Sequence, residues 1–152
     1  MTKAFLLVSV ALVLATLSAR AADRFITRLS LASGQTVVIS EGEFEARSIG
    51  SFSVRLYQAA APENETTFFV SGLISARDGV VEKAMLVDVN SDGQPEIIVV
   101  VRSVGTGSYL SAHAFSIDQH QKLILLASVE GLPSTGDPIS ALRKMAATGT
   151  IE

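Results

Sequence analysis

The chain has 152 residues, which is enough for one domain with a full hydrophobic core and too few for two. It contains 12 Lys and Arg against 15 Asp and Glu without a block of basic residues, which excludes the electrostatic footprint of a nucleic-acid-binding protein. The absence of cysteine excludes disulfides, thiol catalysis, cysteine metal sites and lipid anchoring through an N-terminal cysteine.

The first 21 residues have the layout of a secretory signal peptide. Lys3 gives a positive start, residues 4–17 form an apolar run, and Ala19-Arg20-Ala21 matches a small-residue cleavage site. The apolar run is shorter than the roughly 20 residues of a membrane-spanning helix. We predict cleavage after Ala21, a periplasmic mature protein of residues 22–152, and no membrane attachment after cleavage. Because the segment carries Lys3 and Arg20 but no acid, its removal takes the formal charge from −3 to −5.

Beyond the signal, apolar and polar residues alternate as they do in half-buried strands. The clearest case is residues 51–58, SFSVRLYQ, where Phe52, Val54 and Leu56 share one face. Residues 96–102, EIIVVVR, form an unbroken apolar run, which predicts a central strand covered on both faces. The full set of predicted strands is 25–31, 35–40, 51–58, 66–73, 81–89, 96–102, 109–118 and 121–128.

A short helix is predicted near the C-terminus, in GDPISALRKMA. Asp137 is a suitable N-cap, Pro138 suits the first helical position, and the apolar residues Ile139, Leu142 and Met145 recur three apart. Many short strands without a crossover helix favour an antiparallel sandwich or barrel. We predict an all-β fold: one antiparallel β-sandwich domain of about eight strands, residues 22–152, with this helix packed against it.

The stretch DVNSDGQPE, residues 88–96, has two possible interpretations. Asp88, Asn90 and Asp92 alternate like the first oxygen ligands of a calcium loop, but an EF-hand would need a glutamate where Val99 stands. The same residues suit a plain hairpin loop, because Asn, Asp and Gly tolerate positive φ and bond their own backbone. A calcium-stabilised binding or adhesion module is therefore the alternative functional hypothesis.

Signals for catalysis and for sugar binding are weak. His113 lies on an alternating strand, on the same face as Tyr109 and Ser111, but no nucleophile elbow accompanies it. A small hydrolase is thus a third hypothesis only, and we expect neither enzymatic activity nor a cofactor. Tryptophan, the usual sugar platform, is absent. A core position accounts for most of the strand phenylalanines: Phe52, Phe68, Phe69 and Phe115.

The most distinctive segment is VGTGSY, residues 104–109, between two predicted strands at one end of the sandwich. Gly105 and Gly107 allow unusual backbone conformations and a close approach to another surface. Thr106 and Ser108 offer hydroxyl groups, and Tyr109 adds a rigid ring with a polar end. From the residues alone, a loop that enters a narrow polar cleft and an ordinary glycine-rich hairpin remain equally open.

Residues 91–115, SDGQPEIIVVVRSVGTGSYLSAHAF, together with SVRLY and ISARDG, resemble the periplasmic inhibitors of invertebrate-type (i-type) lysozyme. That family has a Ser-Gly-x-Tyr motif on a protruding loop, which plugs the substrate cleft of the lysozyme. The motif falls on Thr106, Gly107, Ser108 and Tyr109, with threonine in place of serine. The resemblance implies an i-type lysozyme as partner, protection of bacterial peptidoglycan and, for some members, a homodimer.

The threonine is a departure from the family motif. It keeps the hydroxyl group, but its β-methyl group stiffens χ1 and crowds a tip that has to enter a cleft. Ser103 or Ser108 could then supply the contact to the lysozyme acids in place of Thr106. The leading hypothesis is an i-type lysozyme inhibitor that binds through residues 103–109, namely Ser103, Gly105, Thr106, Gly107, Ser108 and Tyr109.

Overall fold

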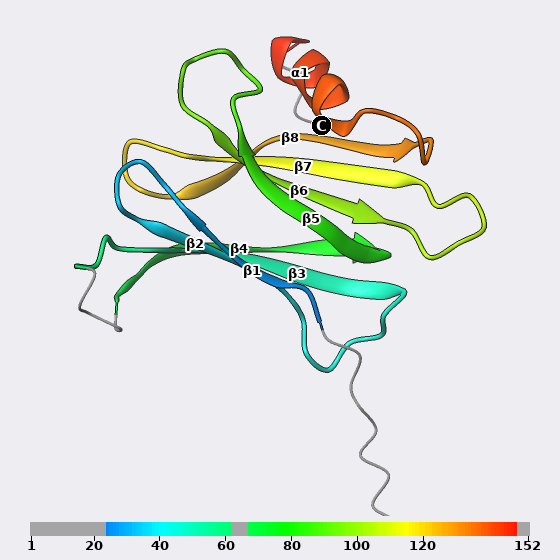
Figure 1. Ribbon diagram of the computed structural model, residues 1–152, viewed down its shortest axis with the longest axis horizontal. Coiled ribbons are helices and arrows are strands. Elements are labelled where there is room, and N and C mark those ends of the chain that lie inside the picture. The colour runs from blue at the N-terminus through cyan, green and yellow to red at the C-terminus, as the bar shows by residue number, and fades with distance from the viewer. Residues whose placement is uncertain (1–23, 62–66, 149–152) are drawn as a thin grey trace, which may run out of the picture.

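The computed structural model describes residues 24–61 and 67–148, which form two facing four-stranded antiparallel sheets and one helix (Figure 1). One sheet has the order β1-β2-β3-β4 and the other β5-β6-β7-β8. The strands are β1 (Ile26–Ser30), β2 (Thr36–Glu41), β3 (Ile49–Tyr57), β4 (Phe69–Asp78), β5 (Val80–Val87), β6 (Glu96–Arg102), β7 (Leu110–Ile117) and β8 (Leu123–Leu132). The predicted eight-stranded sandwich is confirmed, whereas the predicted signal peptide, residues 1–21, lies outside the described residues.

Two strands continue well past their predicted C-terminal ends. β4 continues from Leu73 to Asp78 because Ile74–Asp78 pair with the start of β3, even though Arg77 places a charge on the inner face. β8 continues to Leu132, which pairs with Leu110 across an irregularity in the ladder. In both cases the partner strand extends the ladder beyond the point where the alternating apolar pattern ends.

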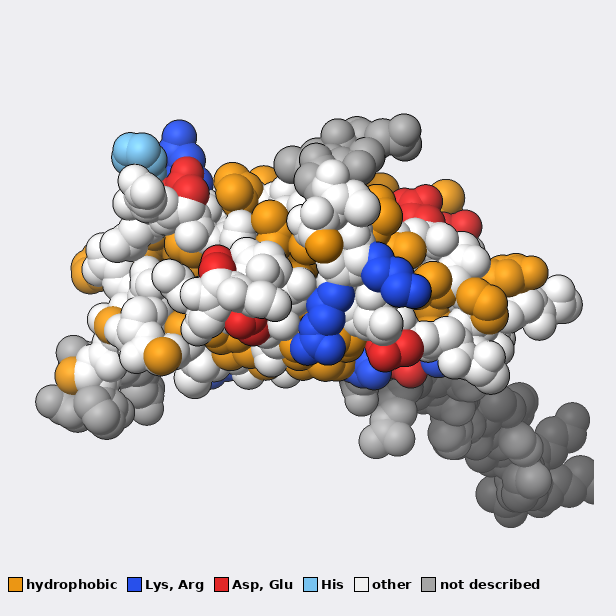
Figure 2. Space-filling view, turned by 90° about the horizontal axis from the view of Figure 1, so that it is seen from above, with side chains coloured by type: hydrophobic (Ala, Val, Ile, Leu, Met, Phe, Trp, Pro, Cys, Tyr) orange, Lys and Arg blue, Asp and Glu red, His pale blue; other side chains and the backbone are white. Residues whose placement is uncertain are grey.

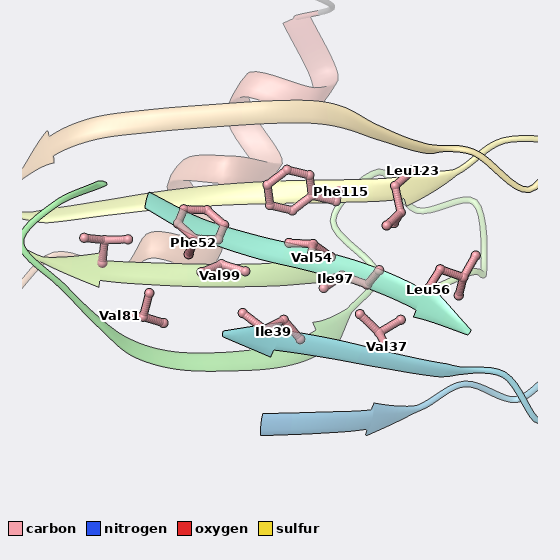
Figure 3. Close-up of a cluster of buried hydrophobic side chains, with 11 residues drawn as sticks. Val37, Ile39, Phe52, Val54, Leu56, Val81, Ile97, Val99, Phe115 and Leu123 are labelled. Carbon is pink, nitrogen blue, oxygen red and sulfur yellow. The ribbon is translucent and has the colours of Figure 1, made fainter. Parts of the chain in front are cut away.

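The main core lies between the sheets and is contributed by alternate residues (Figure 3). Phe52, Val54 and Leu56 of β3 are fully buried there, as their spacing predicts. β6 is buried on both faces: Ile97, Val99 and Val101 point into this core, whereas Ile98 and Val100 belong to a second cluster under the helix. The prediction of a central strand at 96–102 is therefore confirmed.

Helix α1 (Pro138–Thr148) covers the outer face of the β5–β8 sheet (Figure 1). Its first turn is capped as predicted, since the Asp137 carboxylate accepts a hydrogen bond from the amide of Ile139 at 3.0 Å. Leu142 is fully buried, and Ile139 and Met145 pack against the same cluster. No helix in the described ranges is long and apolar enough to cross a membrane.

The core assignment of the phenylalanines is only half right. Phe52 and Phe115 are fully buried and meet edge to face, with ring centroids 6.1 Å apart. Phe68 and Phe69 are 76% and 60% exposed. Both stand where β4 begins, and Phe69 pairs with Tyr57 across the strands, where the ladder register shifts. Its ring packs against that of Tyr57, with centroids 6.1 Å apart, rather than in the core.

The chain changes sheets at a single residue, Gly79, between the end of β4 and the start of β5. Its φ of +123° is rarely open to other residues, and a Cβ atom there would lie 2.1 Å from the carbonyl oxygen of Arg102. The buried Arg77 guanidinium donates hydrogen bonds to the carbonyl oxygens of Gly79, Arg47, Ala46 and Ser51. This single side chain therefore fixes both the corner and the β2–β3 loop.

Glu41 completes the buried polar network across the two sheets. Its carboxylate accepts hydrogen bonds from the amide of Val81 at 2.7 Å, in the opposite sheet, and from that of Phe25 at 3.3 Å. The Arg77 guanidinium lies 3.8 Å away, and both side chains are almost completely buried. Because each charge faces the other and hydrogen-bonded backbone groups, the network is satisfied without water.

Replacement of Arg77 by alanine is expected to lower the free energy of unfolding by about 3–5 kcal/mol, because it leaves the Glu41 charge buried and unpaired. Urea denaturation measures the change. Arg28→Ala, an exposed arginine on β1, is the control and should change stability by less than about 0.5 kcal/mol. Equal effects of the two substitutions would contradict the assigned role of Arg77.

Candidate functional site

The β6–β7 loop, residues 103–109, projects from one end of the sandwich, on the right in Figure 1. The outermost surface at that end in Figure 2 shows hydrophobic and other uncharged side chains. The sequence agrees, because no residue from Ser103 to Tyr109 carries a formal charge. The loop can therefore enter a cleft without bringing an ionised group out of water.

Backbone hydrogen bonds close the loop at its base and again at its tip. The amide of Ser103 donates to the carbonyl oxygen of Tyr109 at 2.9 Å, which continues the β6–β7 ladder by one step. The amide of Ser108 donates to the carbonyl oxygen of Gly105 at 3.0 Å, so that Thr106 and Gly107 are the central residues of a tight turn. The tip is a defined turn, not an open connection.

Arg102, the last residue of β6, holds the loop from one side. Its guanidinium forms a two-pronged ion pair with Glu82 of β5, with N–O distances of 2.6 and 3.1 Å. The remaining terminal nitrogen donates to the carbonyl oxygen of Ser108 at 3.1 Å. Ser108 has a φ of +46°, so this carbonyl contact stabilises a residue in the left-handed region. Sequence analysis did not identify Arg102 or Glu82.

The loop glycines act differently from the sequence prediction. Neither Gly105 nor Gly107 has a φ in the left-handed region, which Ser108 occupies instead. Gly107 is required for space, since a Cβ atom there would lie 2.2 Å from the Tyr109 ring. A Cβ atom at Gly105 would meet only the Ser103 hydroxyl, at 3.9 Å. The Tyr109 ring therefore packs over Gly107, while Gly105 leaves the outer side of the tip slim.

Exposure separates the three candidate hydroxyl groups. Thr106 is exposed at the tip, whereas Ser103 and Ser108 are half-buried. The Tyr109 side chain is 54% exposed although its ring covers Gly107. The predicted loop residues thus lie together, and the threonine that replaces the family serine is the most exposed of the three hydroxyl-bearing residues.

Large apolar side chains at the same end were not identified by sequence analysis. Val104, inside the loop, is 56% exposed, and Ile49 and Phe44, at and near the start of β3, are 63% and 100% exposed. Ile49 pairs with Asp78, beside the corner residue that contacts Arg102. An apolar residue flanked by serine and glycine is the available sequence signal, and it holds for Val104 and Ile49 but not for Phe44.

A pocket of about 270 Å³ lies between the sheets behind the loop. Its lining includes Ser103, Tyr109, Ser111, His113, Arg77, Asp78 and Glu130. His113 is buried, its Nδ1 lies 3.0 Å from the Ser128 hydroxyl, and burial lowers its pKa, an effect that Glu130 partly offsets. No carboxylate of the described residues lies within ion-pair distance of this imidazole, so the acid of a Ser-His-Asp triad is missing there.

The 88–96 segment folds as a hairpin loop. One Asp88 carboxylate oxygen accepts from the amide of Ser91 at 2.7 Å and the other from Gly93 at 3.0 Å. Asn90 and Asp92 bond to each other and to nearby amides. The residues 24–61 and 67–148 contain no group of three or more acidic or histidine side chains placed to hold a metal ion. The geometry accounts for Asp88, Asn90 and Asp92 as turn-forming residues.

Residues 23–146 match the family described as the periplasmic lysozyme inhibitor of I-type lysozyme. The chain belongs to this family. Its fold is similar to the crystal structure of PliI-Ah, the periplasmic lysozyme inhibitor of I-type lysozyme from Aeromonas hydrophyla, with 47% identity and a TM-score of 0.72 over 78% of this chain and 98% of that one. No curated protein matches the chain.

A second solved structure is Aeromonas hydrophila PliI in complex with Meretrix lusoria lysozyme. It is 46% identical, with a TM-score of 0.71 over 78% of this chain and 95% of that chain. The predicted resemblance is thus confirmed, and the family consists of protein inhibitors rather than enzymes. Its description is periplasmic, in agreement with the predicted compartment.

The steric role of Gly107 can be tested by replacement with alanine, which should displace the Tyr109 ring because the new Cβ atom would overlap it. In a Tyr57→Phe background Tyr109 is the only tyrosine, and its ring resonances in NMR spectra report the change. Gly105→Ala is the matched control and should leave those resonances in place. Identical spectra for the two variants would refute the packing of the ring over Gly107.

The lowered pKa of His113 predicts a specific sensitivity to acid. At pH values below the usual histidine pKa of about 6.5, the unfolded chain binds a proton at His113 more readily than the folded protein does. The free energy of unfolding therefore decreases as the pH falls below about 6.5. His113→Asn can keep the hydrogen bond to Ser128 but cannot titrate. Urea denaturation should show a smaller loss of stability between about pH 7 and pH 5 in the variant than in the wild type. Parallel curves would refute this.

Proposed function

We propose that the protein inhibits invertebrate-type lysozyme by inserting the loop 103–109 into the active-site cleft of the enzyme, and so protects bacterial peptidoglycan. The observation that carries this proposal is an uncharged, hydrogen-bonded loop at the end of the sandwich, with Thr106 exposed at its tip. Membership of the inhibitor family, and the complex of its Aeromonas relative with Meretrix lusoria lysozyme, support the same partner.

The chemistry of the target explains why a hydroxyl group suits the tip. Lysozymes cleave peptidoglycan with two carboxyl groups, one ionised and one protonated at the working pH. The Thr106 hydroxyl can donate to the ionised group and accept from the protonated one, in place of water. Ser103 and Ser108 are half-buried beside the loop base, so Thr106 is the better placed of the three.

The built-in order of the loop supports tight binding. The Ser103–Tyr109 and Ser108–Gly105 hydrogen bonds, and the contact from Arg102 to Ser108, hold the turn before any partner arrives. A loop that is already ordered loses less conformational entropy on binding. In this proposal Arg102 and Glu82 position the loop and do not themselves enter the cleft.

Exposed apolar side chains extend the proposed interface beyond the loop. Val104, Tyr109, Ile49 and Phe44 lie at the same end of the sandwich and are each more than half exposed. Aromatic and large apolar anchors often carry most of the binding energy of an interface. We expect Tyr109 to act as such an anchor at the mouth of the cleft, with Val104 beside it.

Export is the second part of the proposal. The family is described as periplasmic, and residues 1–21 have the signal-peptide layout given above. Removal of that segment would leave the whole sandwich intact, because β1 begins at Ile26. The inhibitor would then be positioned where a lysozyme that crosses the outer membrane meets peptidoglycan.

Loss of the Thr106 hydroxyl is expected to weaken inhibition. Thr106→Ala should raise the inhibition constant against an i-type lysozyme by roughly ten- to hundredfold, as expected for a lost hydrogen bond to a charged group. Thr106→Ser, which keeps the hydroxyl group, should stay within about threefold of the wild type. Tyr109→Ala should cost about thirtyfold or more, the effect of an interface hot spot. Lysis of cell walls by i-type, chicken-type and goose-type lysozymes gives the measurement.

Phe68→Ala is the control for these variants, because Phe68 is also an exposed aromatic residue but stands at the opposite end of the sandwich. Its inhibition constant should not change, and all variants should melt close to the wild-type temperature. Undiminished inhibition by both Thr106→Ala and Tyr109→Ala would exclude loop insertion, while failure of the wild type against every i-type lysozyme would exclude the function itself.

A further inference from the structure

The outer face of the β1–β4 sheet has no described helix or strand over it, in contrast to the helix-covered β5–β8 sheet (Figure 1). The strand register brings Ile26, Ser40, Ser53 and Ile74 into one row across this face. A hollow of about 410 Å³ lies over the row. That volume is within the range of small-molecule binding sites.

Two arginines line the hollow, and neither forms an ion pair with a carboxylate of the described residues. Arg55 donates from one terminal nitrogen to the Ser40 hydroxyl at 3.1 Å, while its Nε is buried without a partner. Arg24 donates to the carbonyl oxygen of Glu45, and one of its terminal nitrogens is likewise buried without a partner. Buried nitrogens that lack an acceptor are uncommon in native proteins.

The other polar groups of the hollow define what could fill it. The Ser40 and Ser53 hydroxyls lie 3.0 Å apart and can rotate to donate to a ligand. Glu41 does not compete for the arginines, because its two oxygens bind the amides of Val81 and Phe25. Apart from Glu43, the charged groups of the hollow that have no ionic partner are the two guanidinium donors, which suit an anion.

Three acidic groups limit the strength of the site, and the charge of one of them, Glu41, is balanced by Arg77. Glu43 lines the hollow and is exposed, so it repels an anion. Glu45 accepts hydrogen bonds from the amide and hydroxyl of Ser51, which hold its pKa below the usual value, and Arg24 contributes weakly to the same shift. Both of its oxygens accept from Ser51, and the Arg77 guanidinium lies 3.9 Å from one of them, so the charge of Glu45 is partly compensated.

We propose that this hollow binds a small organic oxyanion, a carboxylate or phosphate monoester, through Arg55 and Arg24. The planar guanidinium group matches the paired oxygens of both anions. The apolar side chains of Phe25, Ile26 and Ile74 give the body of the ligand a surface to contact. The site is separate from the loop 103–109, and the proposal does not depend on lysozyme inhibition.

The test is an NMR titration of the full mature chain with inorganic phosphate, glucose 1-phosphate and glucuronate at constant ionic strength set with chloride. We expect saturable shifts, confined to residues around the hollow, with at least one oxyanion and none with neutral glucose. Tighter binding of a sugar derivative than of phosphate would show that the ligand body also contacts the walls. Absence of saturable binding by all three oxyanions would overturn the proposal.

Three variants distinguish a formed site from general attraction. Arg55→Gln should weaken binding by about tenfold or more, as expected when a charge-assisted hydrogen bond is lost. Glu43→Gln should strengthen it about twofold, because an exposed like charge is removed. Arg28→Gln, on the same face but outside the hollow, should have little effect, and an equal loss there would overturn the proposal.

Phosphatidylglycerol vesicles form the last arm of the experiment. One further result would overturn the proposal: the protein sediments with these vesicles but binds none of the soluble oxyanions. General attraction of a basic surface to anionic lipid would then explain the vesicle binding. The melting temperature of each variant checks that it is folded. We expect values close to the wild type, because the substituted side chains lie on the outer face and not in the core.

Discussion

The structure depends on the point at which the chain leaves one sheet for the other. Only Gly79 separates β4 from β5, and the carbonyl groups around it are held by the buried guanidinium of Arg77. Glu41 balances that charge and bonds to the first strand of the second sheet. The two sheets, each with its strands in sequence order, are thereby joined at one end by a buried charge network in addition to the apolar core between them.

The same corner supports the candidate binding loop. The backbone at Gly79 lies directly against Arg102, the residue from which the loop departs and whose side chain contacts Ser108. The loop therefore starts from the most constrained end of the sandwich, and its own hydrogen bonds complete its conformation. Rigid strands that present a short ordered tip fit an inhibitor, because little conformational freedom remains to be lost on binding.

The two sheets differ in what their outer faces can do. Helix α1 buries Leu142 against the outer face of the β5–β8 sheet and makes that face part of the core. No described element covers the outer face of the β1–β4 sheet, where Arg55 lies over serine hydroxyls and leaves a nitrogen without a partner. Arg24 and Arg55 form no ion pair with a carboxylate of the described residues, so their guanidinium groups can serve an anionic ligand on that face of an otherwise acidic protein.

The sequence by itself determined the strands, the capped helix, the fold class and the position of the loop, because period-two alternation, N-capping and turn composition are local properties of the chain. The tertiary structure alone decided that Ser108, not a glycine, is left-handed, that Gly107 makes room for Tyr109, and that the Asp88 loop is a turn. It also brought Arg77 to the corner and Arg24 beside the hollow of Arg55. Most of these arrangements either join residues that are far apart in sequence or depend on the side-chain packing of a particular loop. Contacts of these two kinds leave no periodic pattern in the sequence from which they could be predicted.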